Sequence, residues 1–184
     1  RHNVQNALGA LAAASELGVD LAAAMAACAR LERVKRRFEV KGRTAQGTLV
    51  MDDYAHHPTE IKATLEAARG AFPDRRIVVC FQPHRYTRTR LLFEELATAF
   101  YGADQLLVLP IYAASEKRDP RVSAEALSEA IRAHGHRGVE YLATPEAAAA
   151  RLGLLLQKDD VLFTMGAGDV WRVGEGLLAP GKGA

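Results

Sequence analysis

Three short polar stretches hold the side chains that could do chemistry, and each follows an apolar stretch of the sequence. Residues 52–58 contain two carboxylates and two imidazoles, residues 82–89 contain one imidazole and two guanidinium groups, and residues 166–169 contain two glycines and an aspartate. Carboxylates and imidazoles together can ligate a metal, bind a ribose or orient a substrate. The sequence alone does not choose among these three uses.

The first stretch does not have the spacing of a structural zinc site. His56 and His57 are adjacent, so they cannot both face one metal from a regular helix as an i, i+4 pair can, and no distant Cys/His set completes four ligands. Asp52 and Asp53 also have an ordinary structural role open to them. At least one of them could cap the helix that we expect to begin at Pro58, a residue suited to a first helical turn.

The second stretch has the residue types of an anion site. Arg85 and Arg88 stand three apart in a predicted strand-to-helix loop, and Arg90 follows two residues later. Two guanidinium groups and the positive end of a helix can bind a carboxylate or a phosphate through charge-assisted hydrogen bonds. The ordinary alternative is pairing with Glu94, Glu95 or a neighbouring aspartate on the surface. The position in a loop favours the anion site.

The third stretch resembles a phosphate-binding glycine turn only in part. Gly166 and Gly168 lack the third glycine of a dinucleotide-binding turn and follow the last predicted strand instead of the first. We therefore favour a tight turn in which Asp169 caps the last helix. The sequence contains no G-x-x-x-x-G-K-[ST] string, so by itself it cannot provide a Walker-type site for the phosphates of ATP and Mg²⁺.

The elements that must position these stretches alternate between apolar strands and periodic helices. This order predicts an α/β fold with a mostly parallel sheet and helices on both faces. Ligands bind at the carboxyl edge of such a sheet, which is where the three polar stretches are expected to meet. The predicted helices cover residues 3–17, 20–31, 58–71, 88–101, 123–133, 145–155 and a segment after 168; the predicted strands cover residues 37–40, 48–51, 77–81, 105–110, a short piece near 141, and 161–165.

Composition limits the class of protein further. A chain of 184 residues fits one substantial domain, or one domain and part of another. With 24 basic and 22 acidic residues, its net charge of +2 gives no reason to expect a nucleic-acid or anionic-membrane partner. The longest helical apolar tract, residues 21–29, is far shorter than the roughly 20 residues of a membrane span. We expect Cys28 and Cys80 to be reduced thiols of a cytoplasmic protein, and the missing initiator Met suggests a piece of a longer chain.

Five strings that span essentially the whole chain resemble the Mur ligase family, and most closely its L-alanine-adding members. The two central strings are long and unusual in composition, so chance agreement is very improbable. The resemblance implies a three-domain enzyme with a UDP-sugar domain, a P-loop ATPase domain and a Rossmann-like C-terminal domain that brings the amino acid. Residues 1–32 would be the last helices of the ATPase domain, and residues 33–184 would be the C-terminal domain. The strings are RHNVQNA at residues 1–7, RRFE at 36–39, DDYAHHPTEI at 52–61, FQPHRYTRT at 81–89 and GAGD at 166–169.

The same resemblance implies a reaction and a set of contacts. The enzyme would join L-alanine to UDP-N-acetylmuramate through an acyl phosphate in peptidoglycan synthesis, with ATP and Mg²⁺ held mainly by the ATPase domain. No residue of this chain is assigned a certain catalytic role, and we expect the chain alone to be inactive because it lacks the P-loop. The L-alanine site would be lined by Tyr54, His56, Arg85 and Arg88, with both arginines on its carboxylate. The nucleotide would be contacted by Asn6 with His2 or Asn3 at adenine, Arg37 at the phosphates and Asp53 at the ribose.

Ala55 stands where we expect Gly in the closest relatives, and because Ala resists positive φ, a slightly different loop geometry is expected. Two other functions stay open. One is the related ligase that recycles a whole tripeptide onto UDP-N-acetylmuramate, against which two arginines beside a small pocket favour a single amino acid. The other is a non-catalytic nucleotide- or anion-binding module. A Rossmann oxidoreductase is disfavoured, because no glycine-rich turn follows the first strand. The sequence leaves the oligomeric state open.

Overall fold

The computed structural model describes residues 2–30 and 34–178, and it divides the chain into two compact units, Arg1–Val34 and Lys35–Ala184. In the first unit, α1 (His2–Glu16) packs against α2 (Leu21–Ala29). The carboxylate of Asp20 accepts a hydrogen bond of 2.9 Å from the amide of Ala23, so Asp20 caps α2. Both predicted helices are therefore present, each shorter at its C-terminal end than predicted.

The second unit is built on a six-stranded sheet with the strand order β1-β2-β6-β3-β4-β5. β1 runs antiparallel to β2, and all the other neighbours are parallel. Every residue of β2, β3 and β6 is buried, as expected for strands covered on both faces. The strands are β1 (Glu39–Arg43), β2 (Leu49–Asp53), β3 (Ile77–Phe81), β4 (Gln105–Val108), β5 (Val139–Tyr141) and β6 (Val161–Met165).

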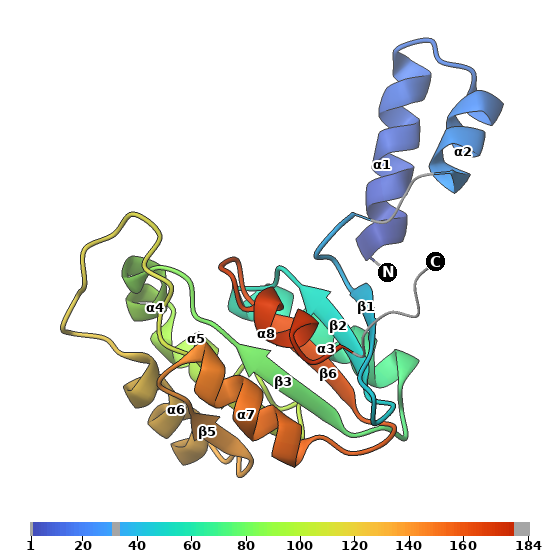
Figure 1. Ribbon diagram of the computed structural model, residues 1–184. Coiled ribbons are helices and arrows are strands. Elements are labelled where there is room, and N and C mark those ends of the chain that lie inside the picture. Colours follow the sequence, from blue (N-terminus) through green and yellow to red (C-terminus); the bar gives the residue numbers. More distant parts are fainter. Residues whose placement is uncertain (1, 31–33, 179–184) are drawn as a thin grey trace. The chain divides into compact units, whose positions relative to one another are not determined.

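Helices cover both faces of this sheet, as Figure 1 shows, which confirms the predicted fold class. Successive residues of β6 alternate between two apolar cores, with Phe163 in one and Leu162 in the other. The first core also takes side chains from α3 (Pro58–Ala71), α5 (Phe93–Ala97) and α6 (Ala124–Ala133). The second takes side chains from α7 (Pro145–Leu155) and α8 (Trp171–Glu175), and a short α4 (Tyr86–Leu91) precedes α5.

The predicted helix over residues 88–101 is wrong in its bounds, because two short helices replace it. Helix α4 begins earlier, at Tyr86, and the chain leaves helical geometry at Leu92, where φ is −110° and ψ is 25°. Helix α5 ends at Ala97, next to a hydroxyl of Thr98 that donates to the carbonyl of Glu95 at 3.2 Å. Such side-chain bonds to the backbone offer an alternative to continued helix.

The first predicted strand, over residues 37–40, is also wrong in its bounds, because the observed strand covers residues 39–43. Arg36 and Phe38 have φ values of 59° and 49°, so the chain turns sharply just before the strand and β1 begins at Glu39. A β-bulge between Val40 and Gly42 then shifts its pairing with β2. This turn brings Arg36 and Arg37 to the carboxyl end of β2.

Candidate functional site

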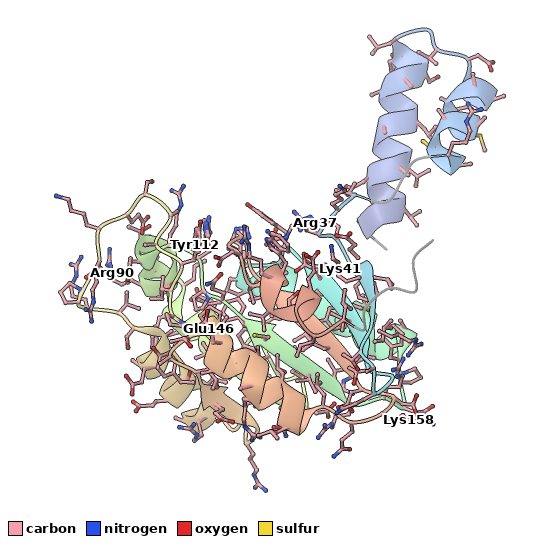
Figure 2. All side chains as sticks on the ribbon, in the orientation of Figure 1. Arg37, Lys41, Arg90, Tyr112, Glu146 and Lys158 are labelled. Carbon is pink, nitrogen blue, oxygen red and sulfur yellow. The ribbon has the colours of Figure 1, made fainter. Side chains whose placement is uncertain are left out.

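The polar loops that follow β2, β3 and β6 meet at one edge of the sheet. Met165, the last residue of β6, pairs with both Asp53 at the end of β2 and Phe81 at the end of β3. The amide of Gly166 donates to the carbonyl of Asp53 at 3.2 Å, and the amide of Gln82 donates to the carbonyl of Met165 at 3.0 Å. The three predicted stretches therefore come together as expected. In Figure 2, Arg37 and Tyr112 mark this edge of the second unit.

Four aromatic side chains form a row along this edge, from the loop after β2 to the loop after β4. We call this the ring row; it consists of Tyr54, His56, His84 and Tyr112. The ring of Tyr54 meets that of His56 edge-on at a centroid distance of 5.3 Å, and His56 lies 5.9 Å from His84. His84 in turn stacks on Tyr112 at 5.5 Å with an interplanar angle of 10°. Tyr112 was not singled out from the sequence, because its immediate neighbours Ile111 and Ala113 are apolar.

The two arginines of the second loop lie beside this row. The Nη1 atom of Arg88 is 3.1 Å from Nδ1 of His84 and 3.3 Å from the carbonyl oxygen of His84. Arg85 takes a positive φ of 71° at the start of α4, and its amide donates to the carbonyl of Tyr112 at 2.8 Å. This backbone turn leaves its side chain exposed.

The alternative reading, in which these arginines pair with surface carboxylates, does not hold for Arg85 and Arg88. Among the described residues, neither Arg85 nor Arg88 lies within 4.0 Å of a carboxylate in an ion pair. Arg90 does form one, at 3.3 Å, but with Asp119 and not with Glu94 or Glu95. Arg85 and Arg88 therefore keep donor groups available for an anionic ligand.

Neither Asp52 nor Asp53 caps α3, so that expectation is corrected. The cap is His57, whose Nδ1 atom accepts from the amide of Thr59 at 3.3 Å. Asp53 is buried, and its two carboxylate oxygens accept from the amides of Phe38 and Ala55, each at 2.8 Å. Burial raises the pKa of Asp53, although the two amides oppose the shift. Each oxygen keeps a second lone pair that can accept from a hydroxyl group.

Ala55 needs no unusual backbone angle. It is fully buried in the core, and it is absent from the described non-glycine residues with positive φ. The loop therefore accommodates alanine at this position without backbone strain, and the expected change in loop geometry has no local cause here.

Arg36 connects the loops through its guanidinium group. Nothing in the sequence distinguished this role of Arg36 from that of its neighbour Arg37. Its Nε atom donates to Asp52 at 2.9 Å, while Nη1 and Nη2 donate to the carbonyls of Gly168 and Gly166 at 3.0 and 2.6 Å. The partner carboxylate is fully buried and also accepts from the hydroxyl of Thr164 at 2.6 Å. Arg36 thus joins the end of β2 to the turn after β6.

Arg37 is free to reach solvent. Its side chain is 50% exposed and lies 3.7 Å from Glu60 and 5.6 Å from the centre of the Tyr54 ring. Glu60 completes a capping box by accepting from the amides of His56 and His57 at 3.1 and 3.2 Å. Burial alone would raise the pKa of Glu60, but these amides and the nearby cations lower it.

The turn at residues 166–168 requires glycine because neighbouring groups crowd it. Gly166 has a φ of 146°, and a Cβ atom on Gly168 would lie 2.5 Å from the Oε1 atom of Gln82 and 2.7 Å from the Tyr112 ring. The expectation that Asp169 caps the last helix is wrong, since the cap position of α8 is Val170 and has no side-chain hydrogen bond. The helix starts too late for the carboxylate of Asp169 to serve it.

Burial lowers the pKa of both imidazoles in the row below the ordinary value of 6.5. For His56, the cations of Arg88 and Arg37 add to this effect, whereas the carbonyl of Tyr54 and the carboxylate of Glu60 oppose it. For His84, burial lowers the pKa most, and the nearby Arg88, His56 and Arg85 lower it further. Both rings are therefore neutral at pH 7.

The residues expected at adenine lie in the first unit. His2, Asn3 and Asn6 belong to α1, and the side chain of Asn6 is exposed. The side chains of His2 and Asn3 lie outside the described part of the structure. Their contribution to a nucleotide site stays a prediction.

The parallel sheet, its loops at the carboxyl edge and two arginines without an ion pair among the described residues define an α/β domain whose polar loops gather at this edge. The Mur ligase model for the glutamate ligase domain matches residues 36–168. The chain belongs to the Mur ligase family.

Relatives and solved structures agree with this family. The UDP-N-acetylmuramate–L-alanine ligase of Desulfosudis oleivorans is 53% identical over 178 residues, which cover 97% of this chain and 39% of that protein. The crystal structure of the UDP-N-acetylmuramate–alanine ligase of Thermotoga maritima has a TM-score of 0.77 and 28% identity, and covers 96% of this chain and 36% of its own. The murein peptide ligase of Psychrobacter arcticus has a TM-score of 0.73, with the same identity and coverage. The chain thus spans about two fifths of the relatives' length.

No described helix is long and apolar enough to cross a membrane. No described group of three or more His, Cys, Asp or Glu side chains could hold a metal ion.

Proposed function

We propose that the chain is part of a cytoplasmic, ATP-dependent ligase that joins L-alanine to UDP-N-acetylmuramate through an acyl phosphate in peptidoglycan synthesis. The names of relatives that share about half of its residues support this function. Residues 1–32 would belong to the end of the ATP-binding domain, and residues 33–184 would form the domain that binds the amino acid. The division of the chain near residue 34 is compatible with this arrangement.

The observation that carries the proposal is the unpaired state of Arg85 and Arg88 beside the ring row. Among the described side chains, no carboxylate competes for either guanidinium group in an ion pair. A free amino acid presents a carboxylate of the size that such a pair of cations binds through charge-assisted hydrogen bonds. Tyr54 and His56 would line the space beside it.

Two other groups of the same edge would contact the nucleotide. Arg37, half exposed, would contact the phosphates, and Asp53 would accept from a ribose hydroxyl. Asn6, with His2 or Asn3, would contact adenine. Mg²⁺ would be held mainly by the part of the enzyme that also carries the P-loop.

In this function, the residues of the chain act by positioning. The ligase activates the muramoyl carboxylate as an acyl phosphate, and the amine of alanine attacks it to give an amide and phosphate. Holding the amine next to the acyl carbon replaces a collision between two molecules with a step inside one complex. Arg85 and Arg88 would fix the amino acid by its carboxylate for that attack.

The tripeptide-recycling ligase is the second candidate. It is favoured by the likeness to the murein peptide ligase of Psychrobacter arcticus, whose TM-score of 0.73 is close to the value of 0.77 for the alanine ligase. Identity is 28% to both, so these two structures do not separate the functions. Higher identity to proteins named alanine ligases makes L-alanine our first choice.

The experiment is ADP release by the full-length enzyme with UDP-N-acetylmuramate, Mg-ATP and either L-alanine or the tripeptide. Turnover with alanine supports the proposal, whereas turnover with the tripeptide alone supports the recycling ligase. Arg85→Ala and Arg88→Ala should each raise the KM for alanine by about 10- to 100-fold, the cost of one charged hydrogen bond. Lys158→Ala, which changes an exposed cation at the opposite end of the second unit from Arg37 and Tyr112 (Figure 2), is the matched control.

A further inference from the structure

The hydrogen bonds of His56 fix which of its ring nitrogens carries the proton. Its Nδ1 atom lies 2.9 Å from the carbonyl oxygen of Tyr54. A carbonyl oxygen can only accept, so the neutral ring must carry its proton on Nδ1. The Nε2 atom of His56 then presents a lone pair. It has no hydrogen-bond partner among the described residues, and it is not fully buried.

The hydrogen bonds of His84 fix the opposite tautomer, with the proton on the other ring nitrogen. Its Nδ1 atom lies 3.1 Å from Nη1 of Arg88, and a guanidinium group can only donate. Nδ1 of His84 must therefore accept, which places the proton of the neutral ring on Nε2. This N–H also has no partner among the described residues and is not fully buried.

Two imidazoles of opposite polarity thus lie side by side, with ring centroids 5.9 Å apart. The accepting ring, His56, has the carboxylate of Glu60 3.4 Å from its Nδ1 atom. The donating ring, His84, is on the side of the arginine loop. A ligand with a hydrogen-bond donor such as an ammonium group at one end and an acceptor such as a carboxylate at the other matches the free nitrogen atoms of these two rings.

We propose that Nε2 of His56 accepts the proton that the amino group of the incoming amino acid must lose, while the Nε2 proton of His84 binds the carboxylate of the same molecule beside Arg88. This inference rests on the proposed function, because it assumes that the edge binds an amino acid. It makes His56 a catalytic residue and His84 a binding residue that selects a free α-carboxylate.

The protons and bonds of the amide-forming step balance. The ammonium group transfers one proton to Nε2 of His56, and the nitrogen lone pair then forms a C–N bond with the carbonyl carbon of the acyl phosphate. The C–O bond to phosphate breaks, and phosphate leaves with the electron pair. The second proton of the nitrogen leaves with the phosphate, and the imidazolium of His56 returns its proton to solvent.

The surroundings of His56 suit this role at neutral pH. Burial and the cations of Arg88 and Arg37 lower its pKa, so the ring is neutral and its lone pair is available. Once the ring gains a proton, the carbonyl of Tyr54 and the carboxylate of Glu60 face the Nδ1 side of the cation. The phenol of Tyr54 and the ring of His84 complete the neighbouring titratable groups.

The test replaces each histidine with asparagine, whose amide can replace the hydrogen bond of Nδ1 but not the group at Nε2. In His56→Asn the amide can still donate to the carbonyl of Tyr54, but the Nε2 lone pair is gone. In His84→Asn the amide oxygen can still accept from Arg88, but the Nε2 proton is gone. His57→Asn is the matched control, because His57 is exposed and asparagine is a good residue for its cap position.

The full-length ligase is assayed for kcat, for the KM of alanine, and for acyl-phosphate formation before alanine is added. We expect His56→Asn to lower kcat by about 10²- to 10⁴-fold, the usual contribution of proton transfer. It should still form the acyl phosphate, and it should lose the acidic limb of kcat/KM for alanine. His84→Asn should instead raise the KM for alanine by about 10- to 100-fold with a smaller change in kcat.

The inference is overturned if His56→Asn keeps its turnover or its acidic limb, or if it stops forming the acyl phosphate. Free imidazole added to a His56→Ala enzyme gives a second measurement, in which restored turnover supports the assignment and unchanged turnover overturns it. A wild-type enzyme that ligates neither alanine nor the tripeptide contradicts the proposed function itself. A wild-type enzyme that ligates alanine normally confines any failure to the roles of His56 and His84.

Discussion

Arg36 holds Tyr54 from two sides at once: its carbonyl accepts from the amide of Tyr54 at 2.7 Å, and its guanidinium carbon lies 5.1 Å from the centre of the Tyr54 ring. The same guanidinium group binds the buried Asp52 and the turn after β6. The position of the first ring in the row therefore depends on a residue outside the row.

Replacing Arg36 with alanine should destabilise the chain. The carboxylate of Asp52, whose side chain is 1% exposed, would lose its only ion-pair partner in the described residues. Breaking a buried pair in this way costs about 3 kcal/mol when, as here, one partner is partly exposed. Arg37→Ala is the control, because its contact with Glu60 is an exposed pair worth at most about 1 kcal/mol. Urea unfolding of both variants measures the difference, and equal losses would contradict the role of Arg36.

Replacing Gly168 with alanine should also destabilise the chain, by about 1 to 3 kcal/mol, because an added methyl group overpacks the turn. The new Cβ atom would lie 2.5 Å from Gln82 and 2.7 Å from Tyr112, so both side chains must move. Gly153→Ala in α7 is the control, since nothing lies within 4 Å of its Cβ position. Alanine should stabilise that helix by up to about 1 kcal/mol. Thermal unfolding of the two variants should therefore shift in opposite directions.

The two imidazoles of the ring row should make the chain less stable as the pH falls below 6.5. Both pKa values are lowered in the folded chain, so the unfolded chain binds protons first. Stability is therefore present above the unfolded pKa and is lost as the pH falls through the folded pKa. Urea midpoints between pH 5 and pH 8 should show this slope, and the double variant His56→Asn, His84→Asn should flatten it. A slope that survives in the double variant but disappears in His57→Asn would contradict this origin.

The two cysteines should differ in reactivity. Burial raises the pKa of the Cys80 thiol to about 12, and its side chain is inaccessible in β3, whereas Cys28 is partly exposed in α2. Since the thiolate is the reactive form, a thiol reagent at pH 8 should label one cysteine per folded chain and two after denaturation. Mass spectrometry identifies the labelled residue, and rapid labelling of Cys80 in the folded chain would contradict its burial.

The parallel core was predictable because its strands are short, continuous apolar runs. Residues 77–81 and 161–165 contain only apolar side chains, apart from Thr164, and the strands occupy these positions as predicted. Helix α3 was equally clear, since Pro58 suits a first helical turn. The helix pair α4 and α5 was missed because its sequence has no proline or glycine at the break.

The loops that form the site could be predicted from the sequence, but the contacts that hold them together could not. The stretches that contain Tyr54, His56, Arg85 and Arg88 could be found from composition and order along the chain. The role of Arg36 could not, because its two carbonyl partners lie 130 and 132 residues away. The capping of α3 by His57 was missed for a different reason, since the two nearby aspartates are the more usual capping residues.

Strand β6 is the last of the six in the sequence, yet it lies in the middle of the sheet between β2 and β3. During synthesis, β2 and β3 therefore have no shared partner until residues 161–165 have left the ribosome. The loops with the imidazoles and the arginines belong to two separate halves of the sheet up to that moment. A nascent chain that stalls before residue 161 should hold all the ring-row side chains and still lack the site.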